Sequence, residues 1–158
     1  MRRKLITCAL ALLAIASTSG AQSAEEGEVM KTVRQLFDGM RKEDSAMVRA
    51  AFHPEAVLQT TAMRNGQTSV GKLGVENFVR SVGTSRPEAL DERIWNEKVF
   101  IDGPLAVVWT DYALFIGTRF SHCGVDAFQL AKMADGWKII ALADTRRTDN
   151  CKQGPEEA

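Results

Sequence analysis

The chain has 158 residues, of which 45% are apolar and 25% are charged. This length and composition suit one globular domain with a hydrophobic core, and no second domain is needed. Basic and acidic residues balance at 20 each, so the charge gives no indication of a nucleic-acid partner.

The first residues predict export. Three basic residues at positions 2–4 precede an apolar run, Leu5–Ala16, that is too short to span a bilayer comfortably. This pattern is typical of a secretory signal peptide covering residues 1–21, with cleavage after Ala21 and a mature chain that starts at Gln22. We therefore expect a periplasmic or secreted protein with no membrane segment after cleavage.

Export would leave two cysteines in a compartment in which disulfides persist. Cys8 lies inside the predicted signal peptide, Cys123 lies in a strand-like run, and Cys151 lies in a polar C-terminal tail, residues 151–158. A disulfide between Cys123 and Cys151 would tie this tail to the strand, and two separate thiols are the alternative.

Three helices are expected. The first, over Glu25–Arg41, has a single apolar stripe along one face, made of Val29, Val33, Leu36, Phe37 and Met40. A short second helix is expected over Ser45–Phe52, with Asp44 or Ser45 as its N-cap. The third is expected over Val75–Val82.

The remaining segments predict strands. Ala56–Met63 and Thr68–Leu73 flank an Asn65-Gly66 turn and form a hairpin. Asp91–Ile101 starts a meander of four strands, and the other three follow within Leu105–Thr148. The order of elements indicates an α+β fold, with helices on one face of an antiparallel sheet.

Four motifs resemble a known family. They are FHPEAVLQT at 52–60, GVENFV at 74–79, LAVVWTDYALFI at 105–116, and the pattern F-x-L-x-K-x-x-D-G-W-K-I at 128–139. Together they resemble the nuclear transport factor 2-like superfamily, in its SnoaL-like or "putative lumazine-binding" group. The resemblance covers nearly all of a single domain spanning residues 22–150.

This resemblance implies a cone, in which a strongly curved sheet wraps a long helix and leaves an apolar pocket at the open end. It also implies a homodimer formed through the sheet. Related cones host isomerases, dehydratases, cyclases and non-catalytic binding domains, so the resemblance indicates a fold and leaves the function open.

Strand alternation sorts the polar groups of the meander by face. His122 and Asp126 share their parity with the apolar Phe128 and Leu130, so all four are expected to face the interior of the cone. An imidazole beside a carboxylate in an apolar cavity can act as a general base. His122 is therefore the better of the two histidines as a catalytic candidate.

The register of the last two strands decides which side chains lie next to His122 and Asp126. A three-residue loop at 134–136 pairs Asp126 with Asp144, whereas a two-residue turn at 135–136 shifts the pairing by one residue. The first register gathers four polar side chains on one face: His122, Asp126, Asp144 and Arg146. They are either a site with paired carboxyls and a guanidinium for an anion, or a structural ion-pair network.

The candidate ligand contacts are Arg146, Trp109, Tyr112 and Phe128. Asp111 and Tyr112 resemble the Asp and Tyr of ketosteroid isomerase, which has this kind of fold. Neighbours on a strand point to opposite faces, however, which argues against an isomerase of that design.

Three functions are compatible with these residues, none of which forms a recognisable metal or cofactor motif. The first is an exported homodimer that binds a small apolar or aromatic molecule, without established catalysis. The second is a cofactor-free lyase or isomerase that uses His122 as base, with Asp126 or Asp144 as acid or orienting group. The third is a protein-interaction module.

Overall fold

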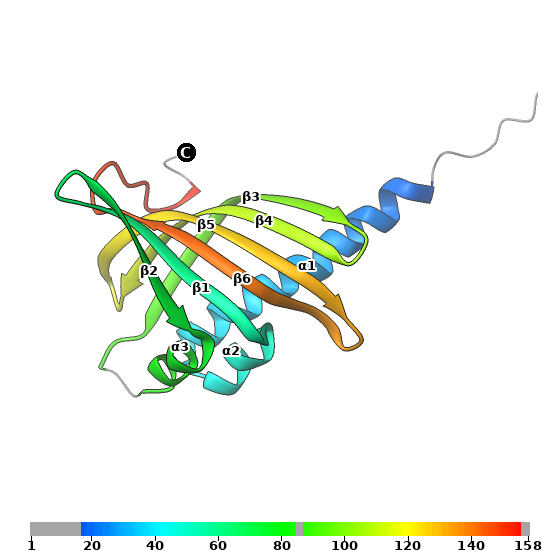
Figure 1. Ribbon diagram of the computed structural model, residues 1–158, viewed down its shortest axis with the longest axis horizontal. Coiled ribbons are helices and arrows are strands. Elements are labelled where there is room, and N and C mark those ends of the chain that lie inside the picture. The colour runs from blue at the N-terminus through cyan, green and yellow to red at the C-terminus, as the bar shows by residue number, and fades with distance from the viewer. Residues whose placement is uncertain (1–16, 85–86, 156–158) are drawn as a thin grey trace, which may run out of the picture.

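The computed structural model describes residues 17–84 and 87–155. Two helices, a hairpin, a third helix and four further strands follow one another, in the order that the sequence predicts (Figure 1). Residues 1–16 of the predicted signal peptide lie outside the described residues, so this peptide and the start at Gln22 stay predictions. No described helix is long and apolar enough to cross a membrane.

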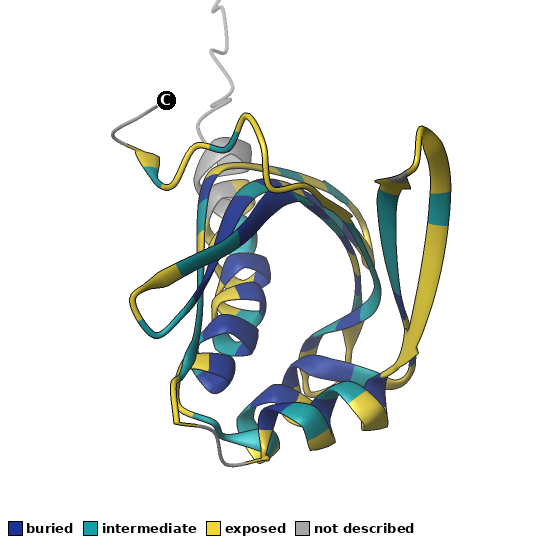
Figure 2. Cartoon of the chain, turned by 90° about the vertical axis from the view of Figure 1, so that its left-hand side faces the viewer, coloured by how far each residue is buried: buried dark blue, intermediate teal, exposed yellow. Residues whose placement is uncertain are grey.

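The long first helix, α1 (Ser17–Arg41), supplies much of the hydrophobic core. Its predicted apolar stripe is at most 5% exposed and consists of Val29, Val33, Leu36, Phe37 and Met40. The curved sheet surrounds this buried face (Figure 2). The helix begins at Ser17, before the expected Glu25. Its buried face is the one that the apolar spacing predicts.

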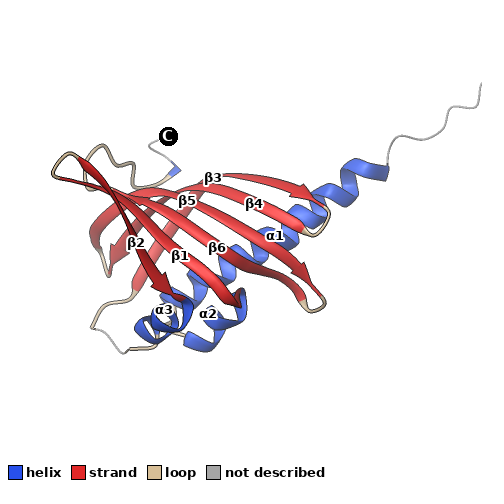
Figure 3. Ribbon diagram, viewed as in Figure 1, coloured by secondary structure: helices blue, strands red, loops and turns tan. Residues whose placement is uncertain are grey.

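Two short helices, α2 (Ser45–Ala51) and α3 (Val75–Val82), lie together at one end of the sheet (Figure 3). Asp44 is the N-cap of α2, because its Oδ1 accepts a hydrogen bond of 2.9 Å from the Met47 N–H. Phe52 opens the first strand and is not the last residue of α2. The bounds of α3 match the prediction.

Six strands form one sheet in the order β2-β1-β6-β5-β4-β3. They are β1 (Phe52–Arg64), β2 (Gln67–Gly74), β3 (Leu90–Asp102), β4 (Leu105–Ile116), β5 (Arg119–Met133) and β6 (Gly136–Arg146). One pair departs from the expected antiparallel arrangement: β1 runs parallel to β6, and Thr60 lies opposite Asp144. Strand β6 runs in the same direction as β1. It pairs with the edge of β1 that β2 leaves open.

The hairpin between β5 and β6 has the register that places Asp126 opposite Asp144. Neither of the expected turns produces it. Met133 pairs with Gly136 across a two-residue turn, and the register then shifts by a bulge next to Gln129. Gly136 accepts this turn at a φ of 113°, and the bulge moves the pairing to the one that a three-residue loop would give.

Cys123 and Cys151 form a disulfide, with their Cα atoms 5.8 Å apart. The tail is held to β5 by backbone as well, since Cys123 and Arg147 exchange two hydrogen bonds of 3.0 Å. Of the two arrangements that the sequence leaves open, the structure has the bridged one.

Gly124 marks a close approach of β6 to β5. A Cβ at this position would overlap the Thr145 carbonyl oxygen and would lie 2.8 Å from the Tyr112 ring. The same carbonyl accepts a hydrogen bond of 2.9 Å from the Tyr112 hydroxyl. Glycine at 124 therefore allows a tyrosine from β4 to reach across β5 to β6.

Gly124→Ala is expected to reduce the free energy of unfolding by at least about 2 kcal/mol, because backbone and a buried ring must move to admit the methyl group. Gly71→Ala is the matched control in another strand, where the nearest atom to a new Cβ is the Thr60 carbonyl oxygen at 3.9 Å. Urea unfolding of both variants measures the effect. Equal stability of the two variants would contradict the close approach at Gly124.

Candidate functional site

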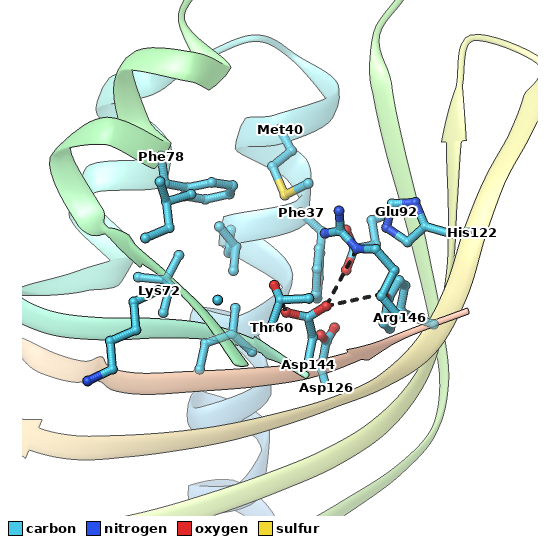
Figure 4. A pocket seen from close by; sticks show the side chains of 16 residues that line it. Phe37, Met40, Thr60, Lys72, Phe78, Glu92, His122, Asp126, Asp144 and Arg146 are labelled. Carbon is cyan, nitrogen blue, oxygen red and sulfur yellow. Dashed lines mark hydrogen bonds and ion pairs between the residues drawn. The ribbon is translucent and has the colours of Figure 1, made fainter. Parts of the chain in front are cut away.

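A cavity of about 240 Å³ lies between α1 and the concave face of the sheet (Figure 4). Much of its wall is apolar and is formed by Leu36, Phe37, Met40, Leu58, Phe78 and Leu142. The polar part of the wall is formed by Thr60, Lys72, Glu92, Tyr112, His122, Asp126, Asp144 and Arg146. A buried pocket that joins an apolar wall to a few polar groups is the usual form of a small-molecule site.

Sheet register brings the polar groups together. Asp126 pairs with Thr110 on one side and with Asp144 on the other, and Asp144 pairs in turn with Thr60. These four residues lie in one row across β4, β5, β6 and β1. Side chains in such a row point to the same face of a sheet, which places two carboxyl groups on adjacent strands.

Glu92, which is half-buried, forms a carboxyl pair with the buried Asp126. Each side chain affects the pKa of the other, and Asp126 is 2% exposed. Burial and the adjacent Glu92 raise the pKa of Asp126 well above its ordinary value. Burial likewise raises the pKa of Glu92 to about 7; the hydrogen bond with Asp126 opposes this shift, and the charge of Asp144 adds to it.

Two carboxyl groups hydrogen-bond to each other only when a proton lies between them. Asp126 Oδ2 is buried and has no ordinary hydrogen-bond partner among the described residues. Burial and the closeness of the two groups both favour the protonated form, so the Glu92–Asp126 pair keeps a proton to higher pH than an isolated carboxyl group in water.

Asp144 has partners of a different kind. Its Oδ1 accepts a hydrogen bond of 2.6 Å from Thr60 Oγ1, and its Oδ2 lies 3.4 Å from the Tyr112 hydroxyl. Arg146 Nε lies 3.9 Å from Oδ2, and the Arg146 side chain is 51% exposed. Asp144 is thus fixed by hydroxyl donors, with a loose and largely solvated ion pair at the mouth of the cavity.

His122 is buried beside Tyr112, with the two rings perpendicular and their centroids 5.8 Å apart. Its Nδ1 lies 2.9 Å from Ser121 Oγ. Burial, with a smaller effect from the charge of Arg146, lowers the pKa of His122 to about 4. The imidazole is therefore neutral at neutral pH and is a weak base, although it remains a hydrogen-bonding group in the wall.

The structure brings most of the predicted site residues together. His122, Asp126, Asp144, Arg146 and Tyr112 all line the cavity. Asp111 points to the other face, as alternation predicts, where it accepts a hydrogen bond of 3.0 Å from Asn96.

Two predicted ligand contacts lie elsewhere. Phe128 is fully buried in the core and packs edge-on against Phe37, with ring centroids 6.1 Å apart. Trp109 has the opposite parity to Tyr112 and is 48% exposed on the outer face of the sheet. With Phe100 and Leu105 it gives this face exposed apolar side chains, but the predicted homodimer through the sheet stays a prediction.

Sequence reasoning did not find Glu92, Thr60 or Lys72. A signal for Glu92 was present, since it shares its parity with Leu90 and Ile94 and so points to the apolar face of β3. Thr60 and Lys72 lie on the hairpin of β1 and β2. They line the cavity because β1 pairs with β6, a strand far away in the sequence.

Comparison with protein families gives one match. The model of the family described as "Putative lumazine-binding" matches residues 24–143. The chain belongs to this family. The fold of the chain is the nuclear transport factor 2-like fold that the motifs resemble, because solved structures described as NTF2-like share it.

Solved structures match in fold across most of the chain. A protein of unknown function from Mycobacterium tuberculosis has a TM-score of 0.69 and 12% identity, over 85% of this chain and 78% of that one. A "putative dehydratase from the NTF2-like family" from Streptomyces avermitilis has a TM-score of 0.62 and 15% identity, over 80% and 99%.

A third structure is the beta subunit of a "putative aromatic-ring-hydroxylating dioxygenase" from Novosphingobium aromaticivorans. It has a TM-score of 0.65 and 12% identity, over 84% of this chain and 95% of that one. Identities this low extend the likeness to the fold alone. A comparison with curated proteins finds no match.

The arrangement can hold a small molecule between an apolar wall and a proton-sharing carboxyl pair. It offers acceptors, a neutral imidazole and a hydroxyl, and in the part of the chain that the structure describes no group of three His, Cys, Asp or Glu side chains is placed to hold a metal ion. Such groups suit hydrogen bonding and proton transfer.

Glu92→Gln is expected to flatten the pH dependence of stability between pH 4.5 and 7. The folded protein holds the Glu92 proton up to about pH 7, whereas the unfolded chain releases it near its ordinary pKa. The free energy of unfolding therefore falls as pH rises through this window, by on the order of 3 kcal/mol. His122 acts in the opposite sense, since its lowered pKa costs stability as pH falls from 6.5 to 4.

Urea unfolding at four values from pH 5 to pH 8 measures the difference between wild type and Glu92→Gln. The control is Glu97→Gln, on the same strand but paired outside the cavity with Arg34 at 3.5 Å, and it is expected to follow the wild-type profile. Parallel profiles for wild type and Glu92→Gln would show that Glu92 keeps an ordinary pKa.

Proposed function

We propose that this protein binds a small, partly apolar molecule in the cavity between α1 and the sheet. The observation that carries the proposal is the division of the cavity wall into an apolar part and a polar part, the latter with the carboxyl groups of Glu92, Asp126 and Asp144. A molecule with an apolar body and a polar edge matches this division.

The size of the cavity limits the ligand. At about 240 Å³ it is smaller than the roughly 300–1,000 Å³ of most ligand pockets. A molecule of one or two rings, or an aliphatic molecule of similar bulk, is the class that this volume supports. The family description, "Putative lumazine-binding", names a two-ring heterocycle and supports the same class.

A cofactor-free lyase or isomerase is the second candidate, and the proton-sharing pair of Glu92 and Asp126 favours it. A carboxyl group with a pKa of about 7 exchanges protons near neutral pH, as a general acid or base must. His122 is the weaker base of the two, because its pKa is lowered to about 4. In this candidate Glu92 moves the proton, and His122 orients the substrate.

The proposed function predicts that single-ring and two-ring compounds, lumazine among them, bind at the cavity. Chemical-shift changes of backbone amides in wild-type protein locate the site and give the affinity. Leu142→Trp fills the cavity from its wall and is expected to weaken binding at least tenfold, whereas Trp109→Ala, on the outer face, is expected to leave it unchanged. Leu142 lines the cavity, whereas Trp109 is exposed.

Two other outcomes decide between the candidates. Unchanged affinity in Leu142→Trp would place the ligand elsewhere and contradict the proposal. Recovery of a bound compound that has lost water or moved a proton would favour the lyase or isomerase, and the same turnover in Glu92→Gln would exclude Glu92 as the group that moves the proton.

A further inference from the structure

The C-terminal end of β6 supplies polar groups to the cavity wall. Asp144 and Arg146 line the cavity. The carbonyl oxygen of Thr145, between them, accepts a hydrogen bond of 2.9 Å from the hydroxyl of Tyr112, which also lines the cavity. The position of this short segment therefore determines where three polar side chains of the wall lie.

Strand β5 holds this segment at two successive places. The Val125 N–H donates a hydrogen bond of 3.0 Å to Thr145 Oγ1. Cys123 then exchanges two backbone hydrogen bonds of 3.0 Å with Arg147, the residue that follows β6. Cys123 comes directly after His122, whose side chain lines the cavity. This part of β5 therefore carries a residue of the cavity wall on one face and the cysteine on the other.

The disulfide lies beside the last of these contacts. Cys151 follows Arg147 by four positions, and residues 148–154 form neither helix nor strand. The end of a strand opens more readily than its middle. Because the bridge ties Cys151 to Cys123, an opened segment has less freedom to move than it would have with a free tail. The bridge therefore disfavours the opened state.

We propose that the Cys123–Cys151 disulfide is a redox-sensitive restraint on the polar wall of the cavity, which keeps the end of β6 closed when the bridge is formed and lets it open when the bridge is reduced. This rests on the proposed function, since it names a regulation of the same binding site. Opening removes the carbonyl acceptor of Tyr112 and moves Arg146 away from the wall. Ligand binding weakens in the reduced protein, because its polar contacts are no longer preorganised.

A dithiol can reduce the bridge from the side of the tail, since Cys151 is half-buried whereas Cys123 is 2% exposed. A thiolate of the reductant attacks Cys151 Sγ, which breaks the S–S bond, forms a mixed disulfide and releases the Cys123 sulfur. The second thiol of the reductant then closes its own disulfide and releases Cys151. Two electrons pass from the dithiol to the bridge, and the two protons that the dithiol loses end on the cysteine thiols.

His122 reports the state of the wall without any ligand. Burial lowers the pKa of His122 to about 4, and opening of the segment beside it admits water. An NMR titration of the imidazole is therefore expected to give a midpoint at least about one pH unit higher after reduction with dithiothreitol. His53, at the start of β1 and outside the cavity lining, is the internal control, and its signal is expected to be the same in both redox states.

Lumazine is the probe for binding. Amide chemical shifts of wild-type protein at pH 7, with the bridge oxidised and with the bridge reduced, give the two affinities. We expect lumazine to bind the reduced protein at least fivefold more weakly, with shift changes at the residues of the cavity wall in the oxidised protein.

Cys151→Ala removes the bridge without a reductant and leaves the buried Cys123 in place. This variant is expected to reproduce the higher His122 midpoint and the weaker lumazine binding. Dithiothreitol added to the variant is the matched control, and it is expected to change neither value. The comparison of the two redox states of wild-type protein needs no variant, so it decides the question if Cys151→Ala fails to fold.

The outcomes separate this restraint from the proposed function. If lumazine binds the oxidised protein and reduction leaves either its affinity or the His122 midpoint unchanged, the restraint is wrong and the proposed function stands. If lumazine does not bind the oxidised protein, the proposed function is wrong for lumazine, and an unchanged His122 midpoint would overturn the restraint as well. Loss of the folded spectrum on reduction would also overturn it, because the bridge would then hold the whole fold and not the wall.

Discussion

The pairing of β6 with β5 on one side and with β1 on the other is the constraint on which the site depends. It places Asp126 opposite Asp144 and Asp144 opposite Thr60. A shift by one residue in either pairing would turn a carboxyl group to the outer face of the sheet. The bulge next to Gln129 is therefore as important to the site as any residue that lines the cavity.

Buried carboxyl groups are costly, and the cost explains their chemistry. Glu92 and Asp126 lie under an apolar helix, where a second negative charge beside the first is unfavourable, so the pair retains a proton that either group alone would lose in water. A stable fold gains nothing from such a pair that two apolar side chains would not supply. This is why we connect the pair with ligand binding and not with stability.

Sequence reasoning succeeded where the determining contacts are local. Apolar spacing predicts the buried face of α1, and strand alternation places His122 and Asp126 on the cavity side of β5 while separating Asp111 from Tyr112. It failed where pairing is long-range. The parallel contact of β1 with β6 connects segments that are far apart in the sequence, since Thr60 and Asp144 are separated by 84 residues. No local pattern encodes such a contact.

The central claim is that Glu92 and Asp126 interact and keep a proton to higher pH than an isolated carboxyl group. Carbon-13 shifts of side-chain carboxyl groups, followed from pH 4 to pH 10 and assigned with Glu92→Gln and Asp126→Asn, test it most directly. We expect one Glu resonance to titrate near pH 7 and one Asp resonance to titrate well above its ordinary range, with each midpoint shifting when the partner is replaced. Titration of every carboxyl group below pH 5 would contradict the account.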